Sequence, residues 1–180
     1  VICVVGFFHP GLAPLIAADT LGPDPRDLGL FTSVLAAGSI AGGVVLQRNS
    51  HKFSRRPAMT LGCFALITAV AQLGMAKGGS VTMVLTMALL IGAGTAGLLS
   101  SANMITQVGT PQIIRGRMAG LSQIAFLGGG GLSGLIAAAL ATTVGLSHTF
   151  AITGGVGLVL AGWEIWRRGE TVLPERTETE

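Results

Sequence analysis

The stretch LGLFTSVLAAGSIAGGVVLQ, from Leu28 to Gln47, contains no charged residue, and the basic segment RNSHKFSRR at 48–56 follows it directly. Its twenty residues rise about 30 Å as a helix, which is about the thickness of the hydrocarbon core of a bilayer. This stretch therefore predicts a membrane-spanning helix that ends at a polar boundary.

Uncharged runs of similar or greater length follow along the chain, at 57–76, 78–114 and 118–163. The last run is long enough for two helices, and Gly145, Ser147 and His148 mark the turn expected inside it. An apolar segment at 1–18, kinked by two prolines, supplies one more helix. The chain is therefore predicted to be an all-α, polytopic membrane protein with six transmembrane helices.

Composition indicates the same fold class. Half of the 180 residues are hydrophobic, 11% are charged, and the mean hydropathy is +0.71, which is more apolar than a soluble domain. The net charge of +3 is scattered over short loops rather than gathered on one face, so no nucleic-acid partner is expected. The lipid bilayer is the partner that composition predicts.

Motifs of catalysis and of metal binding are missing from the sequence. The glycine clusters lack the lysine of a phosphate-binding loop, no GxSxG occurs, and no paired carboxylates lie within a span. Cys3 and Cys63 stand alone in apolar stretches, so we expect reduced, buried thiols. The chain is accordingly predicted to be no enzyme and to bind no cofactor and no metal.

Basic residues divide unequally between the two ends of the predicted helices. Four Lys or Arg lie in segment 48–56, two in the turn 110–117 and three in 167–176, against Arg26 and Lys77 at the opposite ends. By the positive-inside rule, the basic ends and the C-terminus face the cytoplasm, in the inner (plasma) membrane of the cell.

Two parts of the chain are distinguished by composition. Residues 1–168 are predicted to form a six-helix transmembrane bundle whose first helix is truncated, because the chain starts inside an apolar run, as a fragment would. Residues 169–180 are polar and acidic, and they are expected to form a disordered cytoplasmic tail.

Glycines cluster within the predicted spans, as in the stretches GSIAG and GGGGLSG. Small residues allow the backbones of membrane helices to approach closely, so Gly38, Gly42, Gly130 and Gly134 are predicted helix-packing positions.

The second and fifth predicted helices match each other at an offset of 91 residues, with Gly29, Leu30, Gly38 and Gly43 falling on Gly120, Leu121, Gly129 and Gly134. These helices would cross the membrane in opposite directions. The match is therefore the kind that an inverted repeat of a secondary transporter produces.

Two motifs carry a resemblance to a known family. The stretch NMITQVGTPQIIRGRMAGL at 103–121 holds an Asn-x(3)-Gln pair and a Pro-x(3)-Arg-Gly-Arg pattern, and FFHPGLAPLIAADTLG at 7–22 holds a Pro-Leu pair. The matching residues are Asn103, Gln107, Pro111, Arg115, Gly116 and Arg117, with Pro14 and Leu15. The sequence resembles the C-terminal half, helices seven to twelve, of major facilitator superfamily transporters, in particular the branch that includes the enterobactin exporter and macrolide efflux proteins.

This resemblance implies a secondary active transporter that works by alternating access. It implies export of a small amphipathic or hydrophobic compound, such as a drug or siderophore, with the proton as coupling ion. It also implies a missing N-terminal six-helix half as partner. Family members often carry an acidic residue where this chain has Gln47, so the gating hydrogen bond of that residue is not implied here.

Three polar residues are candidates for the substrate cavity. His9 falls near mid-bilayer, where an ionisable group is a functional-site hypothesis; the alternative is a neutral histidine bonded to a carbonyl freed by a nearby proline. Asn103 and Gln107 are one helical turn apart on one face. They either line the inner vestibule or form hydrogen bonds between helices.

Arg48, Arg115, Gly116 and Arg117 are the candidates for topology and gating. Their charges orient the helices. The resemblance also implies a gate, in which an acidic residue of the missing half docks on Arg117 and on the amino end of the helix that follows.

A second class of function stays open from the sequence. A six-helix membrane scaffold or assembly protein, acting as a homodimer through its Gly-rich faces, would have the same glycines and the same topology.

Overall fold

The structure is a computed structural model that describes residues 9–21, 24–55, 57–108 and 110–168. These ranges are helical and contain no β-strand. The elements are α2 (His9–Thr20), α3 (Pro25–Arg48), α4 (Ser50–Arg55), α5 (Pro57–Ala76), α6 (Val81–Val108), η1 (Gln112–Ile114), α7 (Arg115–Val144) and α8 (Leu146–Arg168). Five helices, α3, α5, α6, α7 and α8, are long and apolar enough to cross a membrane. The predicted all-α, polytopic membrane fold is confirmed.

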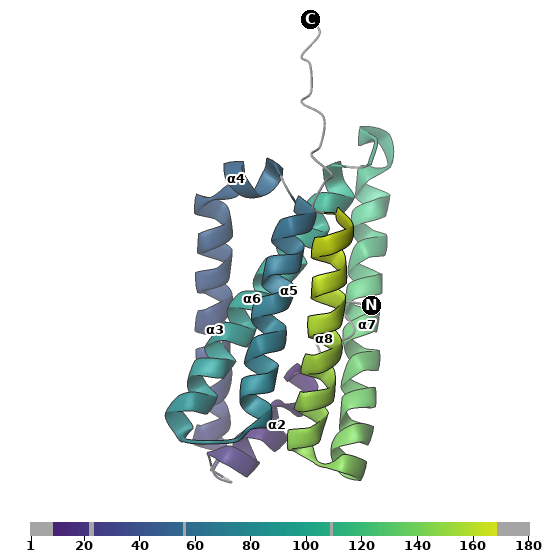
Figure 1. Cartoon of the computed structure of the whole chain (residues 1–180). Helices are drawn as coiled ribbons and strands as arrows, with labels where there is room; N and C mark the ends of the chain where they lie inside the picture. The colour runs from purple at the N-terminus through teal and green to yellow at the C-terminus, as the bar shows by residue number, and fades with distance from the viewer. Residues whose placement is uncertain (1–8, 22–23, 56, 109, 169–180) are drawn as a thin grey trace, which may run out of the picture.

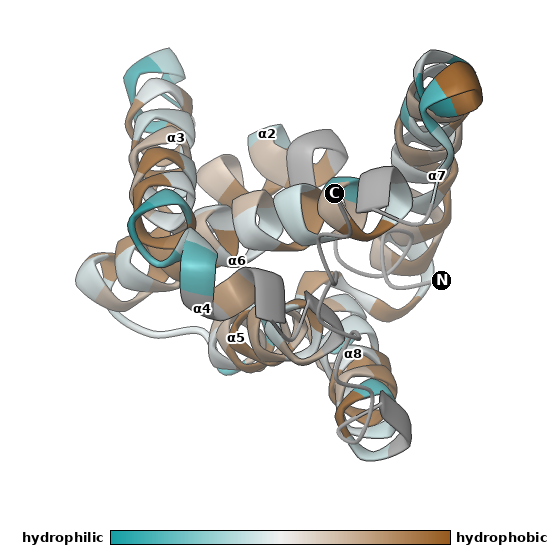
Figure 2. Cartoon of the chain, turned by 90° about the horizontal axis from the view of Figure 1, so that it is seen from above, coloured by the Kyte–Doolittle hydropathy of each residue, from teal (hydrophilic) through white to brown (hydrophobic). Residues whose placement is uncertain are grey.

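The long helices lie side by side, and the short helix α4 lies across one end of them (Figure 1). Seen from that end, α3 and α7 project to one side of the bundle, and α2 and α6 lie between them (Figure 2). Helices α5 and α8 lie on the opposite side. The molecule thus has an inner pair, α2 and α6, flanked by two arms, α3 and α7.

Helix α6 is central to the packing, because it contacts α3 and α5, and α5 in turn packs along α8. The main apolar core joins Phe31 of α3, Ile91 of α6 and Phe150 of α8. A smaller core around Phe64 and Leu98 lies nearer to the α4 end. Helix α7 has few contacts with the rest of the chain.

Helices α3 and α6 approach each other closely at glycines. A Cβ atom on Gly38 would overlap the carbonyl oxygen of Leu89, and one on Gly42 would overlap the α6 backbone one turn further on. From the α6 side, a Cβ on Gly92 would overlap the carbonyl oxygen of Leu35. A backbone atom cannot move aside cheaply, so glycine is required at these three positions.

Two predicted loops at the polar ends are shorter than expected. Segment 48–56, expected to be a loop, contains the helix α4. In the turn 110–117, Arg115 and Arg117 lie inside the first turn of α7. Charged residues are solvated beyond the hydrocarbon core, so a helix can continue past the point where hydropathy falls.

Local signals set two other helix ends. Helix α3 begins before its apolar run because the Asp24 carboxylate accepts a hydrogen bond from the Arg26 backbone N–H at 2.9 Å and Pro25 occupies the first helical position. Between α7 and α8, Gly145 has a φ of +88° and a ψ of 161°, a conformation that essentially only glycine adopts. The turn predicted inside the long uncharged run is therefore confirmed.

Candidate functional site

The candidate cavity residues lie on the inner pair of helices. His9 is the first residue of α2, and Asn103 and Gln107 lie near the end of α6. The side chains of His9 and Gln107 fall outside the described part of the structure, whereas Asn103 is half-buried. No hydrogen bond joins the Asn103 amide to a described residue. That amide is therefore not used to link two helices within the described chain.

These candidates lie at two levels of the bundle. Asp19 of α2 and Val84 of α6 line one cavity and so mark a common level. Counted along each helix, His9 is about 15 Å from Asp19 and Asn103 is about 28 Å from Val84. Asn103 is therefore about twice as far along its helix from the level of that cavity as His9 is, and the three residues do not form one cluster.

Asn103 lies beyond the end of α3. It is eleven residues after Gly92 and so continues the face of α6 that meets α3. Gly42 of α3 is level with Ala93 of α6. From that level α3 continues for six residues, to Arg48, whereas Asn103 is ten residues further along α6. The amide accordingly stands at the rim of the α3–α6 contact, at the end of the bundle that carries α4.

Basic residues gather at this same end, where α3 stops and α7 starts (Figure 1). Arg48 and Arg117 are exposed, and Arg115 is half-buried with an Nε atom that has no hydrogen-bond partner among the described residues. A Cβ on Gly116 would meet no atom within 4 Å, and no side chain caps the start of α7 at Ile114. Two guanidinium groups thus lie at the amino end of α7, where the helix dipole is positive, which suits a negatively charged partner.

The four glycines predicted to pack helices differ in their surroundings. Gly38 and Gly42 lie in the α3–α6 contact. Gly130 is half-buried, and its carbonyl accepts a hydrogen bond from the Ser133 hydroxyl at 2.9 Å within α7. A Cβ on Gly134 would meet no atom within 4 Å, so the described chain brings no neighbouring helix close to this glycine.

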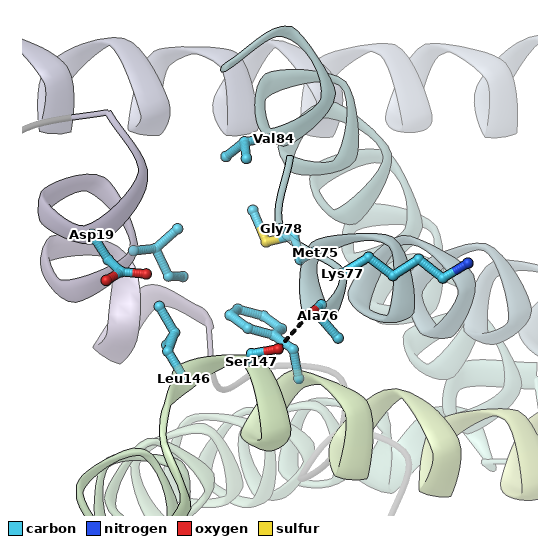
Figure 3. Close-up of a pocket in the computed structure, with 10 residues that line it drawn as sticks. Asp19, Met75, Ala76, Lys77, Gly78, Val84, Leu146 and Ser147 are labelled. Carbon is cyan, nitrogen blue, oxygen red and sulfur yellow. Dashed lines mark hydrogen bonds between the residues drawn. The ribbon is translucent and has the colours of Figure 1, made fainter. Parts of the chain in front are cut away.

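The opposite end of the bundle contains a cavity of about 260 Å³ that sequence analysis missed. Asp19, Met75 and Phe150 line it from α2, α5 and α8. The Ser147 hydroxyl donates a hydrogen bond to the carbonyl of Ala76 and so joins the start of α8 to the end of α5 (Figure 3). Because separate helices contribute these residues, no local motif indicates the cavity.

One side chain lies elsewhere than expected. Cys63, expected to be buried, is exposed on α5. An apolar stretch of a membrane helix faces either another helix or lipid, and hydropathy does not distinguish the two. Within the described ranges, no group of three or more His, Cys, Asp or Glu is placed to hold a metal ion.

Comparison with known families decides the class of protein. The profile of the Major Facilitator Superfamily matches residues 1–180. The chain belongs to the major facilitator superfamily. Comparisons with curated proteins and with solved structures gave no match.

As a major facilitator protein, the chain is a multi-pass membrane protein of a transporter family. Its helices α2, α3, α6 and α7 lie toward one side, with α5 and α8 behind them (Figure 2). This arrangement is consistent with half of a major facilitator fold, in which two six-helix bundles face each other. Membership of the family also favours a transporter over a membrane scaffold.

Proposed function

We propose that this chain corresponds to helices seven to twelve of a major facilitator exporter and works by alternating access with a second six-helix bundle. The observation that carries the proposal is that few residues of the two arms, α3 and α7, are buried within the described chain. In the most apolar stretches, 11% of the residues are buried in the α7 span and 17% in α3, against 22% in α8, 44% in α6 and 50% in α5. Because both arms project to the same side of the inner pair, a second bundle placed there would cover all four helices together.

Charge distribution supports the proposed class of substrate. Helix α6 carries no charged residue, α3 carries none between Asp27 and Arg48, and α7 carries none after Arg117. The hydroxyl groups of Thr86, Thr95 and Thr106 donate to backbone carbonyls of α6 itself, at 2.7 Å in the case of Thr95 and Ile91. A surface of this kind offers apolar contact and few hydrogen bonds, so we propose export of a small amphipathic or hydrophobic compound such as a drug or siderophore.

The proton is the proposed coupling ion. The membrane spans carry no Asp, Glu, Lys or Arg near their middle, which leaves His9 as an ionisable group at that depth. We propose that His9 contacts the substrate or carries the proton, and that Asn103 and Gln107 line the vestibule at the α4 end of the pathway.

The basic end is proposed to face the cytoplasm, in the inner membrane, by the positive-inside rule. There Arg117, beside Arg115 and Gly116 at the start of α7, would receive an acidic residue of the second bundle and close the pathway, and Arg48 would add positive charge at the same end, on the other arm. The exposed guanidinium of Arg117 and the uncapped start of α7 support this gate.

Export of the neutral lipophilic dye Nile red from cells that express the full protein tests the function. We expect that His9→Ala abolishes dye export at unchanged membrane abundance, because the proposed mid-membrane ionisable group is lost. The matched control is His148→Ala, which removes an exposed histidine near the start of α8 and should export normally. Normal export by His9→Ala would remove His9 from the pathway, and no energised export by the unchanged protein would contradict the exporter assignment for such compounds.

Charge reversal tests the gate. Arg117→Glu should slow dye export at least 10-fold, an order-of-magnitude estimate for placing like charges opposite each other at a closed contact. Lys77→Glu reverses a charge at the opposite end of the bundle and serves as the control. Equal export rates for the two variants would contradict the gate without bearing on His9.

A further inference from the structure

A pocket beneath α4 has no part in the proposed transport pathway. It lies between α3, α4 and α5 and has a volume of about 360 Å³. None of the candidate cavity or gate residues lines it. We propose that this pocket holds an acyl chain of an anionic phospholipid, and that the lipid headgroup lies against the basic end of α3 and α4.

The depth of the pocket matches one leaflet of a bilayer. Val45, near the end of α3, lines it at the polar boundary, and Ile67 of α5 lines it ten residues from Pro57. Ten residues of helix correspond to about 15 Å, half of a hydrocarbon core of about 30 Å. Val45 and Ile67 are 49% and 39% exposed, so the pocket opens to the side of the bundle, where acyl chains are.

Helix α4 is held over the pocket by contacts with α5. The Phe53 ring of α4 meets the Phe64 ring edge-on, with centroids 6.2 Å apart and an angle of 67° between the planes. The Thr60 hydroxyl donates a hydrogen bond to the carbonyl of Phe53 at 3.4 Å. Among the described residues of the lining, that hydroxyl is the one oxygen-bearing side chain, so the described lining suits a hydrocarbon chain better than a polar ligand.

The segment that follows Val45, at the polar end of the pocket, is basic, and Arg48 in it is exposed. Segment 48–56 contains Arg48, Lys52, Arg55 and Arg56 and no acidic residue. Hydrophilic residues gather over α4 and the end of α3 (Figure 2), and α4 lies across the end of the long helices (Figure 1). The end of a membrane-spanning helix is where lipid headgroups are expected. Basic groups beside a membrane helix attract anionic lipids, so charge and pocket together select an anionic phospholipid.

Lipid retention by the full protein in neutral detergent tests the proposal. Phosphatidylglycerol and phosphatidylcholine with identical acyl chains are supplied in equal amounts, and native mass spectrometry counts the lipids that stay bound. We expect one phosphatidylglycerol to be retained in preference to phosphatidylcholine. The double variant Arg48→Gln with Lys52→Gln should weaken its retention roughly 25-fold, the effect of two basic residues near an anionic headgroup.

A variant that fills the pocket distinguishes lipid binding in the pocket from general attraction of lipid to positive charge. Cys63→Trp places a large ring in the pocket and leaves the basic segment intact, so it should abolish the phosphatidylglycerol preference. Val70→Trp is the control, because Val70 is an exposed residue of the same helix outside the pocket. Equal retention of both lipids by the unchanged protein, or an unchanged preference in Cys63→Trp, would overturn the proposal.

Covalent mapping keeps the test decisive if a variant fails to fold. Phosphatidylglycerol with a photoreactive diazirine on its acyl chain is bound to the unchanged protein and activated. Attachment to α4 and to residues 59–67 of α5, displaced by unlabelled phosphatidylglycerol and not by phosphatidylcholine, supports the site. Attachment spread along the outer faces of α7 and α8 would show general lipid contact and overturn it.

Discussion

Helices α3 and α7 are the two arms of the molecule, and they carry the matching residues of the 91-residue offset. Several matched positions have similar surroundings. A Cβ on Gly29 or on Gly120 would meet no atom within 4 Å, and Leu30 and Leu121 are 46% and 60% exposed. Yet α3 packs tightly on α6, whereas α7 packs loosely on the rest of the described chain.

The two arms differ in how they meet their neighbouring helices. Helix α6 has 28 residues and runs beside α3 along its length, so the glycines of α3 meet a continuous backbone. Helix α7 instead divides its few contacts among α2, α6 and α8 and packs along none of them as α3 packs along α6. Small residues thus permit close packing, but a neighbouring backbone at the same level is needed to produce it.

The largest effect on stability is expected from adding a side chain at Gly38, where α3 lies close to α6. We expect Gly38→Val to destabilise the bundle by about 3 kcal/mol, because its side chain would overlap the backbone of α6. Unfolding by detergent titration, followed by the fluorescence of Trp163 and Trp166 at the end of α8, measures the change. Gly43→Val is the matched control, since a Cβ on Gly43 meets no atom within 4 Å. Equal stability of the two variants would contradict a close α3–α6 contact.

The second-largest effect on stability is expected from a change in the connection between α7 and α8. Gly145→Ala should cost about 1–3 kcal/mol, because its backbone conformation disfavours any Cβ. There is room for the added atom, since a Cβ there meets nothing within 4 Å, so the cost is conformational. The same detergent titration measures it, and an unchanged midpoint would show that the turn relaxes freely.

A hydrogen bond between α3 and α6 should have a smaller effect. The Ser39 hydroxyl lies 3.2 Å from the carbonyl oxygen of Gly92, so Ser39→Ala should destabilise the bundle by about 0.6 kcal/mol, the average for such bonds in membrane proteins. Ser33→Ala, at an exposed position of α3, is the control. A cost above about 2 kcal/mol would mean that the serine contributes through packing as well.

The smallest effect is expected on α7. Gly134→Ala should change stability by no more than about 0.5 kcal/mol, in the stabilising direction, because alanine favours helix and the added Cβ meets no neighbour. The same titration measures it beside Gly38→Ala. A loss of dye export with unchanged stability would place a second bundle against α7. A loss of stability above about 1 kcal/mol would contradict the loose packing of this arm.

Hydropathy and charge predicted the helices well. Helix α5 begins at Pro57 and ends at Ala76, as the uncharged run 57–76 predicts, and the break at Gly145 was readable from turn residues. These features are local, because a bilayer leaves the backbone no choice but helix within the hydrocarbon core. Sequence motifs also indicated the candidate residues Asn103 and Arg117. Their positions relative to the other helices came from the structure.

Tertiary structure alone decided which faces of the helices meet. It separates Gly38, against α6, from Gly134, with no close neighbour among the described residues, and it leaves Cys63 exposed on α5. It also brings Asp19 together with Phe150 at one end. The sequence by itself determined that the chain crosses a membrane and where each span lies. It could not determine the packing faces, because lipid-facing and helix-facing surfaces are equally apolar and only the neighbouring backbone tells them apart.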